Sequence, residues 1–241
     1  MDKIHALLVA VIITVGFASV YSFYLEGDRE AVRIVRVIDG DTVVLEDGRT
    51  VRLLNINAPE KKTFASQEAT DFLERYLNKT VELEATDIEK YGRTLGRLYG
   101  PEYMNLGLVE NGLASIFLVT DSERKTFYQA QQKAVKSGQG MWNHSDYFGC
   151  IDSDIDKQEE YVFFRVECNS TLVGWTIKDE STKTYTIRRA IREDFILHSG
   201  EGTDSEHERY WDAGNVWNND RDSLFIRDKS GRLVYYESYG Y

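Results

Sequence analysis

Basic residues, proline and cysteine are all scarce in this sequence, and each shortage excludes a class of protein. The 241 residues include 29 Lys and Arg against 40 Asp and Glu, a formal net charge of −11, which argues against coating nucleic acid through bulk positive charge. Two prolines exclude proline-rich linkers and collagen-like sequence. Two cysteines are too few for a four-cysteine zinc site or a dense disulfide scaffold. What is left is a globular chain whose length predicts two domains.

The negative charge is concentrated in the last third of the chain. Residues 148–241 carry 12 basic and 19 acidic side chains, whereas residues 31–147 carry 15 and 17. The middle of the chain is therefore close to neutral, and a few arginines in one cleft can give it a local positive potential. The overall acidity does not exclude nucleic acid as a partner of this middle segment.

The first 30 residues predict a membrane anchor or a signal peptide. Residues 6–25 form an uncharged run of 20, preceded by Lys3 and followed by Glu26 and Asp28. This length suffices for a membrane-spanning helix, and the flanking charges predict that the rest of the chain lies outside the cell membrane. A cleaved signal peptide is the alternative, and the protein would then be secreted. We therefore expect an exported protein.

Export bears on the two cysteines. An oxidising compartment favours a disulfide between Cys150 and Cys168, which lie 18 residues apart. The alternative is two independent buried thiols.

Residues 31–147 show the pattern of a small barrel with helices packed on it. Runs rich in β-branched residues are separated by Asp39-Gly40 and Asp47-Gly48, which are hairpin signals. Apolar spacing predicts helices over about 69–77, 105–111 and 122–137, the last two ending at glycines. About five strands and three helices, an α+β arrangement, are expected.

Beyond residue 147 the sequence predicts an all-β domain. Residues 148–158 are rich in Asp and Glu and are expected to be an acidic linker; they lack the glycine and the final carboxylate of an EF-hand calcium loop. Residues 159–241 contain short strand-like runs separated by turn residues. A β-sandwich is the expected architecture.

Three segments of the middle domain carry charged residues that a barrel does not need for folding. They are Ile38-Asp39-Gly40-Asp41-Thr42, Arg52-Leu53-Leu54 with Pro59-Glu60 downstream, and Lys90-Tyr91-Gly92-Arg93. Together they resemble the thermonuclease, or staphylococcal nuclease-like, family over about residues 31–147. That resemblance implies an OB-fold barrel with three helices and a metal-dependent phosphodiesterase.

The resemblance also implies roles for individual residues. Two guanidinium groups match the charge that develops on a phosphodiester during hydrolysis, and a glutamate can orient or deprotonate the attacking water. Ca²⁺, or another divalent cation, prefers oxygen ligands. The implied catalytic residues are Arg52, Glu60 and Arg93; the implied metal ligands are Asp41, Asn57 and the backbone carbonyl of Ala58; and Lys90 and Tyr91 are implied to contact the substrate.

Two departures from the family pattern affect these expectations. Asn57 stands where the best-known members have a second metal-binding aspartate, so weaker metal affinity or a different divalent preference is expected. The segment Phe117-Leu118-Val119-Thr120 lacks the tyrosines that pack the bound nucleotide in the well-studied enzyme. Base preference is therefore left open.

The last part of the chain resembles the lamin-tail domain. The resemblance rests on Gly174-Trp175-Thr176, the loop that follows Leu197-His198-Ser199-Gly200, and Trp217-Asn218-Asn219-Asp220. It implies an immunoglobulin-like sandwich over about residues 159–241 that binds or tethers a partner of unknown identity. Trp175 and Trp217 are expected in its core.

The expected function is an exported, calcium-dependent nuclease. Its substrate would be DNA, and RNA as a second candidate, cut with little sequence specificity. The alternative is a catalytically weak or inactive surface module that binds nucleic acid or protein.

Overall fold

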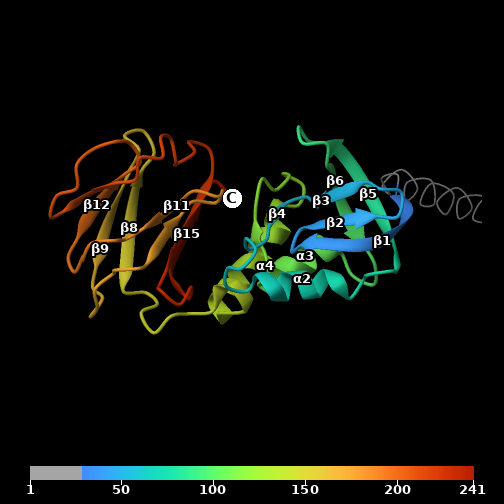
Figure 1. Cartoon of the computed structure of the whole chain (residues 1–241), viewed down its shortest axis with the longest axis horizontal. Helices are drawn as coiled ribbons and strands as arrows, with labels where there is room; N and C mark the ends of the chain where they lie inside the picture. The colour runs from blue at the N-terminus through green and yellow to red at the C-terminus, as the bar shows by residue number, and fades with distance from the viewer. Residues whose placement is uncertain (1–28) are drawn as a thin grey trace, which may run out of the picture.

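The computed structural model describes residues 29–241, which form a β-barrel and a pair of β-sheets lying side by side (Figure 1). The anchor or signal segment expected in residues 1–30 lies outside the described residues, except for its last two, which begin the first strand. Within residues 29–241, no helix has the length and apolar character needed to cross a membrane.

The N-terminal unit is a closed five-stranded barrel of the OB-fold type, with strand order β1-β2-β3-β6-β5. Alternate apolar side chains such as Ile34, Val51 and Leu83 fill its interior, as expected for strands with one face in a core. The β3–β6 pair is parallel and the other neighbours are antiparallel. The strands are β1 (Arg29–Asp39), β2 (Thr42–Leu45), β3 (Thr50–Leu53), β5 (Thr80–Ile88) and β6 (Thr94–Tyr99).

Three α-helices pack on the barrel: α2 (Ser66–Glu74), α3 (Met104–Glu110) and α4 (Arg124–Ser137), followed by the short 3₁₀ helix η1 (Gly140–Trp142). The expected glycine after each of the last two α-helices is confirmed. Gly112 and Gly138 have φ of 66° and 63°, the left-handed conformation that glycine adopts without a steric penalty. A small sheet of β4 (Ile56–Asn57) and β7 (Ser115–Ile116) lies beside the barrel.

The C-terminal unit consists of two four-stranded sheets that share one hydrophobic cluster, which we call the sandwich. Trp175 and Trp217 are both buried in this cluster, as predicted. One sheet has the order β11-β10-β14-β15 and the other β13-β12-β9-β8. The strands are β8 (Ile151–Asp156), β9 (Tyr161–Val166), β10 (Thr176–Lys178), β11 (Thr184–Thr186), β12 (Phe195–His198), β13 (Glu208–Tyr210), β14 (Asp222–Arg227) and β15 (Leu233–Tyr239).

The prediction that residues 148–158 form a solvated linker is wrong for most of the segment, because it contains β8. Acidic residues alternate with Ile151, Ser153 and Ile155, so every second side chain faces inward while the carboxylates stay near solvent. The number of acidic residues alone suggests a linker, because it takes no account of this alternation between inward-facing and solvent-facing side chains. The adjoining Cys150 is linked to Cys168 by a disulfide in the structure.

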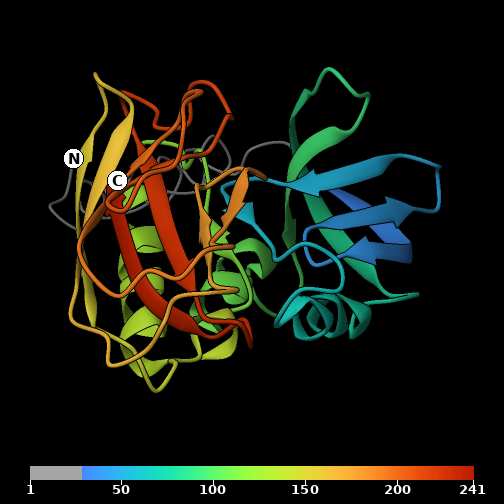
Figure 2. The same cartoon turned by 60° about the vertical axis from the view of Figure 1, so that its left-hand side comes forward.

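The two units share a hydrophobic interface centred on Trp142. Its ring stacks on Phe225 with centroids 5.7 Å apart and meets the edge of Tyr236 at 4.8 Å. The Tyr236 hydroxyl accepts a hydrogen bond of 2.7 Å from Gln131 of α4. Figure 2 shows the red strands of the β14–β15 sheet running in front of the yellow-green helix α4. The two units are therefore held together by a separate hydrophobic cluster at their interface, in addition to the core of each unit.

Candidate active site

A tight turn between β1 and β2 places the first candidate residue. A Cβ atom on Gly40 would lie 2.5 Å from the Cβ of Ala69 and 2.7 Å from that of Ala58, so only glycine permits this close approach. The turn consequently packs against α2 and the segment after β4. Asp41 thereby reaches the backbone of Ala58.

Asp41 is buried and has several hydrogen-bond partners. One carboxylate oxygen accepts the backbone N–H of Ala58 at 2.8 Å, and the other lies 3.2 Å from Nε of Arg52. The Thr42 hydroxyl donates to that second oxygen at 2.9 Å. Burial nevertheless raises the pKa of Asp41, and the nearby Asp39 adds to the rise, although Arg52 opposes both. The carboxylate therefore favours additional positive charge in its surroundings.

Arg52 is held by three hydrogen-bond acceptors and by its ion pair with Asp41, which restricts what it can do. Besides Asp41, its Nη1 donates to the carbonyls of Leu53 and Ile56 at 2.6 and 2.8 Å, and its Nη2 donates to Oδ1 of Asn57 at 3.1 Å. A guanidinium has five N–H groups, so one on Nη2 is left for a phosphate oxygen. Arg52 therefore cannot offer both of its terminal nitrogens to one phosphate in this arrangement.

Arg93 has the donors that Arg52 lacks. It lies directly before β6, and its Nε pairs with Glu89. Its two terminal nitrogens have no partner within the part of the chain that the structure describes. Asp41 and Asp39 are close enough to raise the pKa of Arg93 further, after the larger effect of the Glu89 hydrogen bond. Arg93 is the residue that can present a two-pronged donor.

Lys90 and Tyr91 lie at the tip of the same β5–β6 loop. The Lys90 ammonium is 5.0 Å from the centroid of the Tyr91 ring, and Tyr91 is 74% exposed. An aromatic ring in that position offers a stacking surface to a base.

Asn57 joins the barrel to the sandwich. Its Oδ1 accepts from Arg52, and its Nδ2 donates to the backbone carbonyl of Glu180 at 3.2 Å. An aspartate in this position could not donate to that carbonyl. The asparagine that departs from the family pattern is therefore the residue that can donate a hydrogen bond to the Glu180 carbonyl of the sandwich.

Asn55 and Glu123 fix the course of the chain between Arg52 and Glu60. Asn55 adopts φ of 69°, and its side chain donates to Glu123 at 2.6 Å while accepting the N–H of Thr120 at 3.1 Å. Glu123 is also paired with Arg97 at 2.7 Å. This half-buried network holds the β3–β4 connection against α4.

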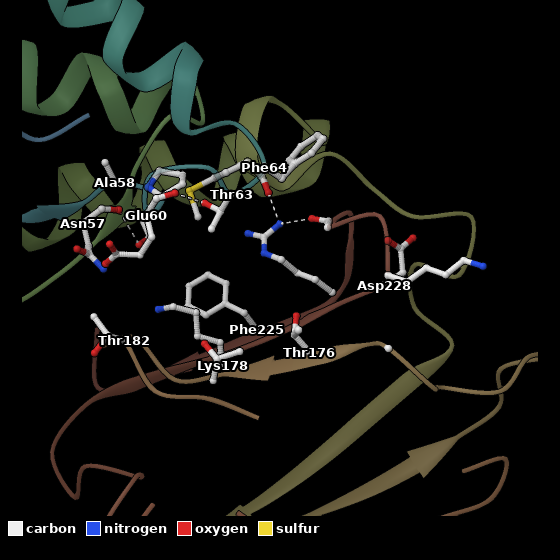
Figure 3. Close-up of a pocket in the computed structure, with 18 residues that line it drawn as sticks. Asn57, Ala58, Glu60, Thr63, Phe64, Thr176, Lys178, Thr182, Phe225 and Asp228 are labelled. Atoms are coloured by element: carbon white, nitrogen blue, oxygen red, sulfur yellow. Dashed lines mark hydrogen bonds between the residues drawn. The ribbon is translucent and has the colours of Figure 1, made fainter. Parts of the chain in front are cut away.

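Glu60 is exposed on the segment that follows β4 and precedes α2. Within residues 29–241, its carboxylate accepts no hydrogen bond and belongs to no ion pair, so it is free to bind a water molecule. It borders a cavity of 340 Å³ between the barrel unit and the sandwich. Across that cavity stands Lys178 of β10 (Figure 3).

The oxygen atoms near Asp41 fit a hard divalent cation. The carboxylate of Asp41, the amide oxygen of Asn57 and the carbonyl of Ala58 are all oxygen donors, the type of ligand that Ca²⁺ prefers. Within the described residues, no cluster of three or more His, Cys, Asp or Glu side chains suits a metal ion. Any cation here would thus be held by fewer than three such side chains, with neutral oxygens and substrate as its other ligands.

The sequence did not reveal the contribution of the sandwich to this region. Lys178, Glu180 and Arg227 lie about 120 residues or more from the candidate loop along the chain, so no local pattern could connect them. Glu180 is buried, and its side chain accepts the Tyr241 hydroxyl at 2.6 Å. Burial, with smaller effects of Asp222 and Asp179, raises its pKa to about 7.

We expect this raised pKa to make stability depend on pH. The fold raises the pKa of Glu180 to about 7, whereas the carboxyl of the unfolded chain has its ordinary pKa of about 4.5. Protonated Glu180 therefore makes its full contribution to the free energy of unfolding below about pH 4.5, and this contribution is lost as the pH rises toward 7. Urea unfolding at pH 5 and pH 8 should show a smaller pH difference for Glu180→Gln than for wild type or for the exposed control Glu201→Gln. Equal pH differences in all three proteins would contradict this prediction.

Comparison with known proteins agrees with the barrel and its motifs. A model of the family described as "Staphylococcal nuclease homologue" matches residues 50–144. An uncharacterized endonuclease of Escherichia coli O157:H7 is 34% identical over 120 residues, covering 47% of this chain and 78% of the relative. The thermonuclease of Staphylococcus hyicus is 33% identical over 132 residues, with coverage of 48% and 78%. The micrococcal nuclease of Shigella flexneri is 29% identical over 156 residues, with coverage of 57% and 82%. From its barrel, its motifs and these relatives, the chain belongs to the staphylococcal nuclease homologue family.

Proposed function

We propose that this protein is a metal-dependent nuclease that hydrolyses phosphodiester bonds of DNA, and of RNA as a second substrate. The observation that carries the proposal is the Asp41–Arg52–Asn57 network. Glu60 follows Asn57 by three residues, and within residues 29–241 its carboxylate has no hydrogen-bond or ion-pair partner. The named nuclease relatives support the same reaction class.

In the proposed mechanism, each side chain acts on a different part of the phosphodiester. Arg93 offers its free terminal nitrogens to two non-bridging oxygens, and Arg52 adds one N–H and a fixed positive charge. Glu60 orients the attacking water and accepts its proton. Lys90 and Tyr91 contact the flanking nucleotide. Asp41, Asn57 and the Ala58 carbonyl would hold the cation, which when bound neutralises charge on the phosphate and acts as a Lewis acid.

We expect cleavage to require the cation. With the full chain and a labelled single-stranded DNA oligonucleotide, added Ca²⁺ should support cleavage, and excess EDTA should reduce it to background. Because Asn57 supplies no negative charge, half-maximal activity should need a higher Ca²⁺ concentration in wild type than in Asn57→Asp. Mg²⁺ and Mn²⁺ serve as comparison ions. Cleavage that is equal with and without EDTA would contradict a metal-dependent mechanism.

The second candidate function is binding without catalysis. The specific observation that favours it is Asn57, which leaves one carboxylate in the oxygen set where the family pattern has two. The same experiment separates the two functions. Retention of the oligonucleotide with no cleavage under any of the three ions would establish the binding module.

For the sandwich we propose a lamin-tail domain of immunoglobulin-like type that binds or tethers a partner. The two packed sheets and the buried Trp175 and Trp217 support this proposal. We also propose that the protein is exported, either anchored with its domains outside or secreted. The uncharged run over residues 6–25 and the Cys150–Cys168 disulfide support export.

A further inference from the structure

The cavity beside Glu60 has walls from both units. Asn57 ends β4 and the segment after it supplies Pro59 and Phe64. Thr176, Lys178 and Arg227 come from β10 and β14 of the sandwich (Figure 3). Its volume of 340 Å³ is in the range of small-molecule sites. The barrel alone could not form this cavity, because the sandwich supplies part of its lining.

Two cations on the sandwich side lack negative partners. Lys178 donates to the backbone carbonyls of Asp179 and Ser181, and Arg227 uses only Nη1, which donates to the carbonyls of Met141 and Gly231. Within residues 29–241, neither side chain lies within ion-pair distance of a carboxylate. Nε and Nη2 of Arg227 are left without a protein acceptor.

Burial makes these unpaired charges unfavourable. It lowers the pKa of Lys178, against the opposing influence of Asp179 and Glu60, and it lowers that of Arg227 to about 10. Asp228 also borders the cavity, but its carboxylate is occupied by donors from Ser145, Ser230 and the backbone of its own turn. An anion entering the cavity would remove the imbalance.

The rest of the lining is suited to a base or a sugar. Phe64, Met141 and Phe225 contribute apolar surface, and Phe64 is 38% exposed. Thr176, Thr182 and Thr184 add hydroxyl groups around it. A phosphate attached to a flat aromatic base matches this combination of cations, hydroxyls and ring faces.

We propose that this cavity binds one nucleotide of the substrate strand next to the scissile phosphate, with its phosphate on Lys178 and Arg227 and its base against Phe64. The proposal rests on the nuclease function proposed above and adds a subsite to it. Glu60 borders the cavity, so an occupant would adjoin the bond on which Glu60 acts. Lys178 is then a substrate-binding residue supplied by the sandwich.

The test uses two substrates that differ by one phosphate. A dinucleoside monophosphate contains only the scissile phosphate, and the same compound with an added terminal phosphate, at the 5′ or the 3′ end, can also occupy the cation pair. In wild type, the terminal phosphate should raise kcat/KM. In Lys178→Met the gain should fall about tenfold, the effect of removing one charge-assisted hydrogen bond. The gain is the ratio of kcat/KM with and without the terminal phosphate in the same variant, so a change that affects both substrates equally cancels.

Lys157→Met is the matched control. Lys157 is also a lysine of the sandwich whose ammonium donates to a backbone carbonyl, that of Asn219 at 3.1 Å, and it is not part of the cavity lining. It should retain the full gain. An unchanged gain in Lys178→Met, with the variant folded by circular dichroism, would overturn the subsite.

A binding measurement distinguishes failure of the subsite from failure of the proposed function. Titration of the full chain with deoxyadenosine 5′-monophosphate, with deoxyadenosine and inorganic phosphate as comparisons, reports on the cavity without any cleavage. Saturable nucleotide binding that Lys178→Met weakens supports the subsite even if no substrate is cut. Cleavage by wild type, together with nucleotide binding that is identical in wild type and Lys178→Met, rejects the subsite and leaves the nuclease proposal intact.

Discussion

Glu60→Gln is expected to reduce nuclease activity by about 10² to 10⁴, the usual contribution of a general acid or base. The amide keeps the size of the side chain but cannot accept a proton from water. Glu60 is exposed and, within the described residues, its carboxylate has no hydrogen-bond or ion-pair partner, so the free energy of unfolding should change by less than about 0.5 kcal/mol. Single-turnover cleavage of a DNA oligonucleotide and thermal unfolding measure the two effects separately.

The control for this variant is Glu68→Gln, an exposed glutamate in the first turn of α2. It should retain wild-type activity. Oligonucleotide binding by Glu60→Gln should also persist, because Arg52 and Arg93 are untouched. If Glu60→Gln cleaves as fast as Glu68→Gln, another group activates the water and the role assigned to Glu60 is wrong.

Trp142→Ala is expected to destabilise the protein by about 3 to 5 kcal/mol, as large-to-small changes of aromatic residues in a core do. Trp142 has no solvent exposure and contacts both Phe225 and Tyr236 across the interface. Its loss leaves a cavity between the units rather than inside one of them. We therefore expect calorimetry to show two separated transitions in the variant, and proteolysis to cut between residues 143 and 150.

Trp142→Phe provides the matched comparison. Among the described residues the indole Nε1–H has no hydrogen-bond partner, so phenylalanine loses no such bond and keeps an aromatic ring in contact with the sandwich. Its destabilisation should be clearly smaller. A single transition at the wild-type midpoint in Trp142→Ala would mean that this interface contributes little to holding the units together.

The barrel was predictable because its signals are local. Asp47-Gly48 marks a turn wherever it separates two β-branched runs, and glycine after an apolar helix period ends the helix at Gly112 and Gly138. The start of α2 is different. Ala65 precedes the helix with φ of 63°, a conformation that nothing in the identity of alanine indicates. The β8 strand was not predicted because its three aspartates suggested a solvated linker, although they alternate with residues that face inward.

The candidate site divides in the same way. Motif spacing identifies Asp41, Arg52 and Glu60, and the resemblance assigns them to one site. The sequence cannot show how many N–H groups of Arg52 already donate hydrogen bonds within the protein, because that number depends on the positions of the carbonyls of Leu53 and Ile56. Nor can it show the sandwich cations, since Lys178 and Glu60 meet only after the two units have packed together. Contacts of this kind are determined by tertiary structure.

The interface centred on Trp142 also determines the geometry of any tether. An appended domain on a flexible linker lets a nuclease sweep a volume set by linker length. Here the last turn of the barrel unit is packed against the sheet that carries β14 and β15, so this interface sets the position of the sandwich relative to the Glu60 cavity. Whatever surface the sandwich holds, the bond that is cut would lie at a constant distance and angle from it. The protein would then select positions along a strand as a ruler does, by offset rather than by base sequence.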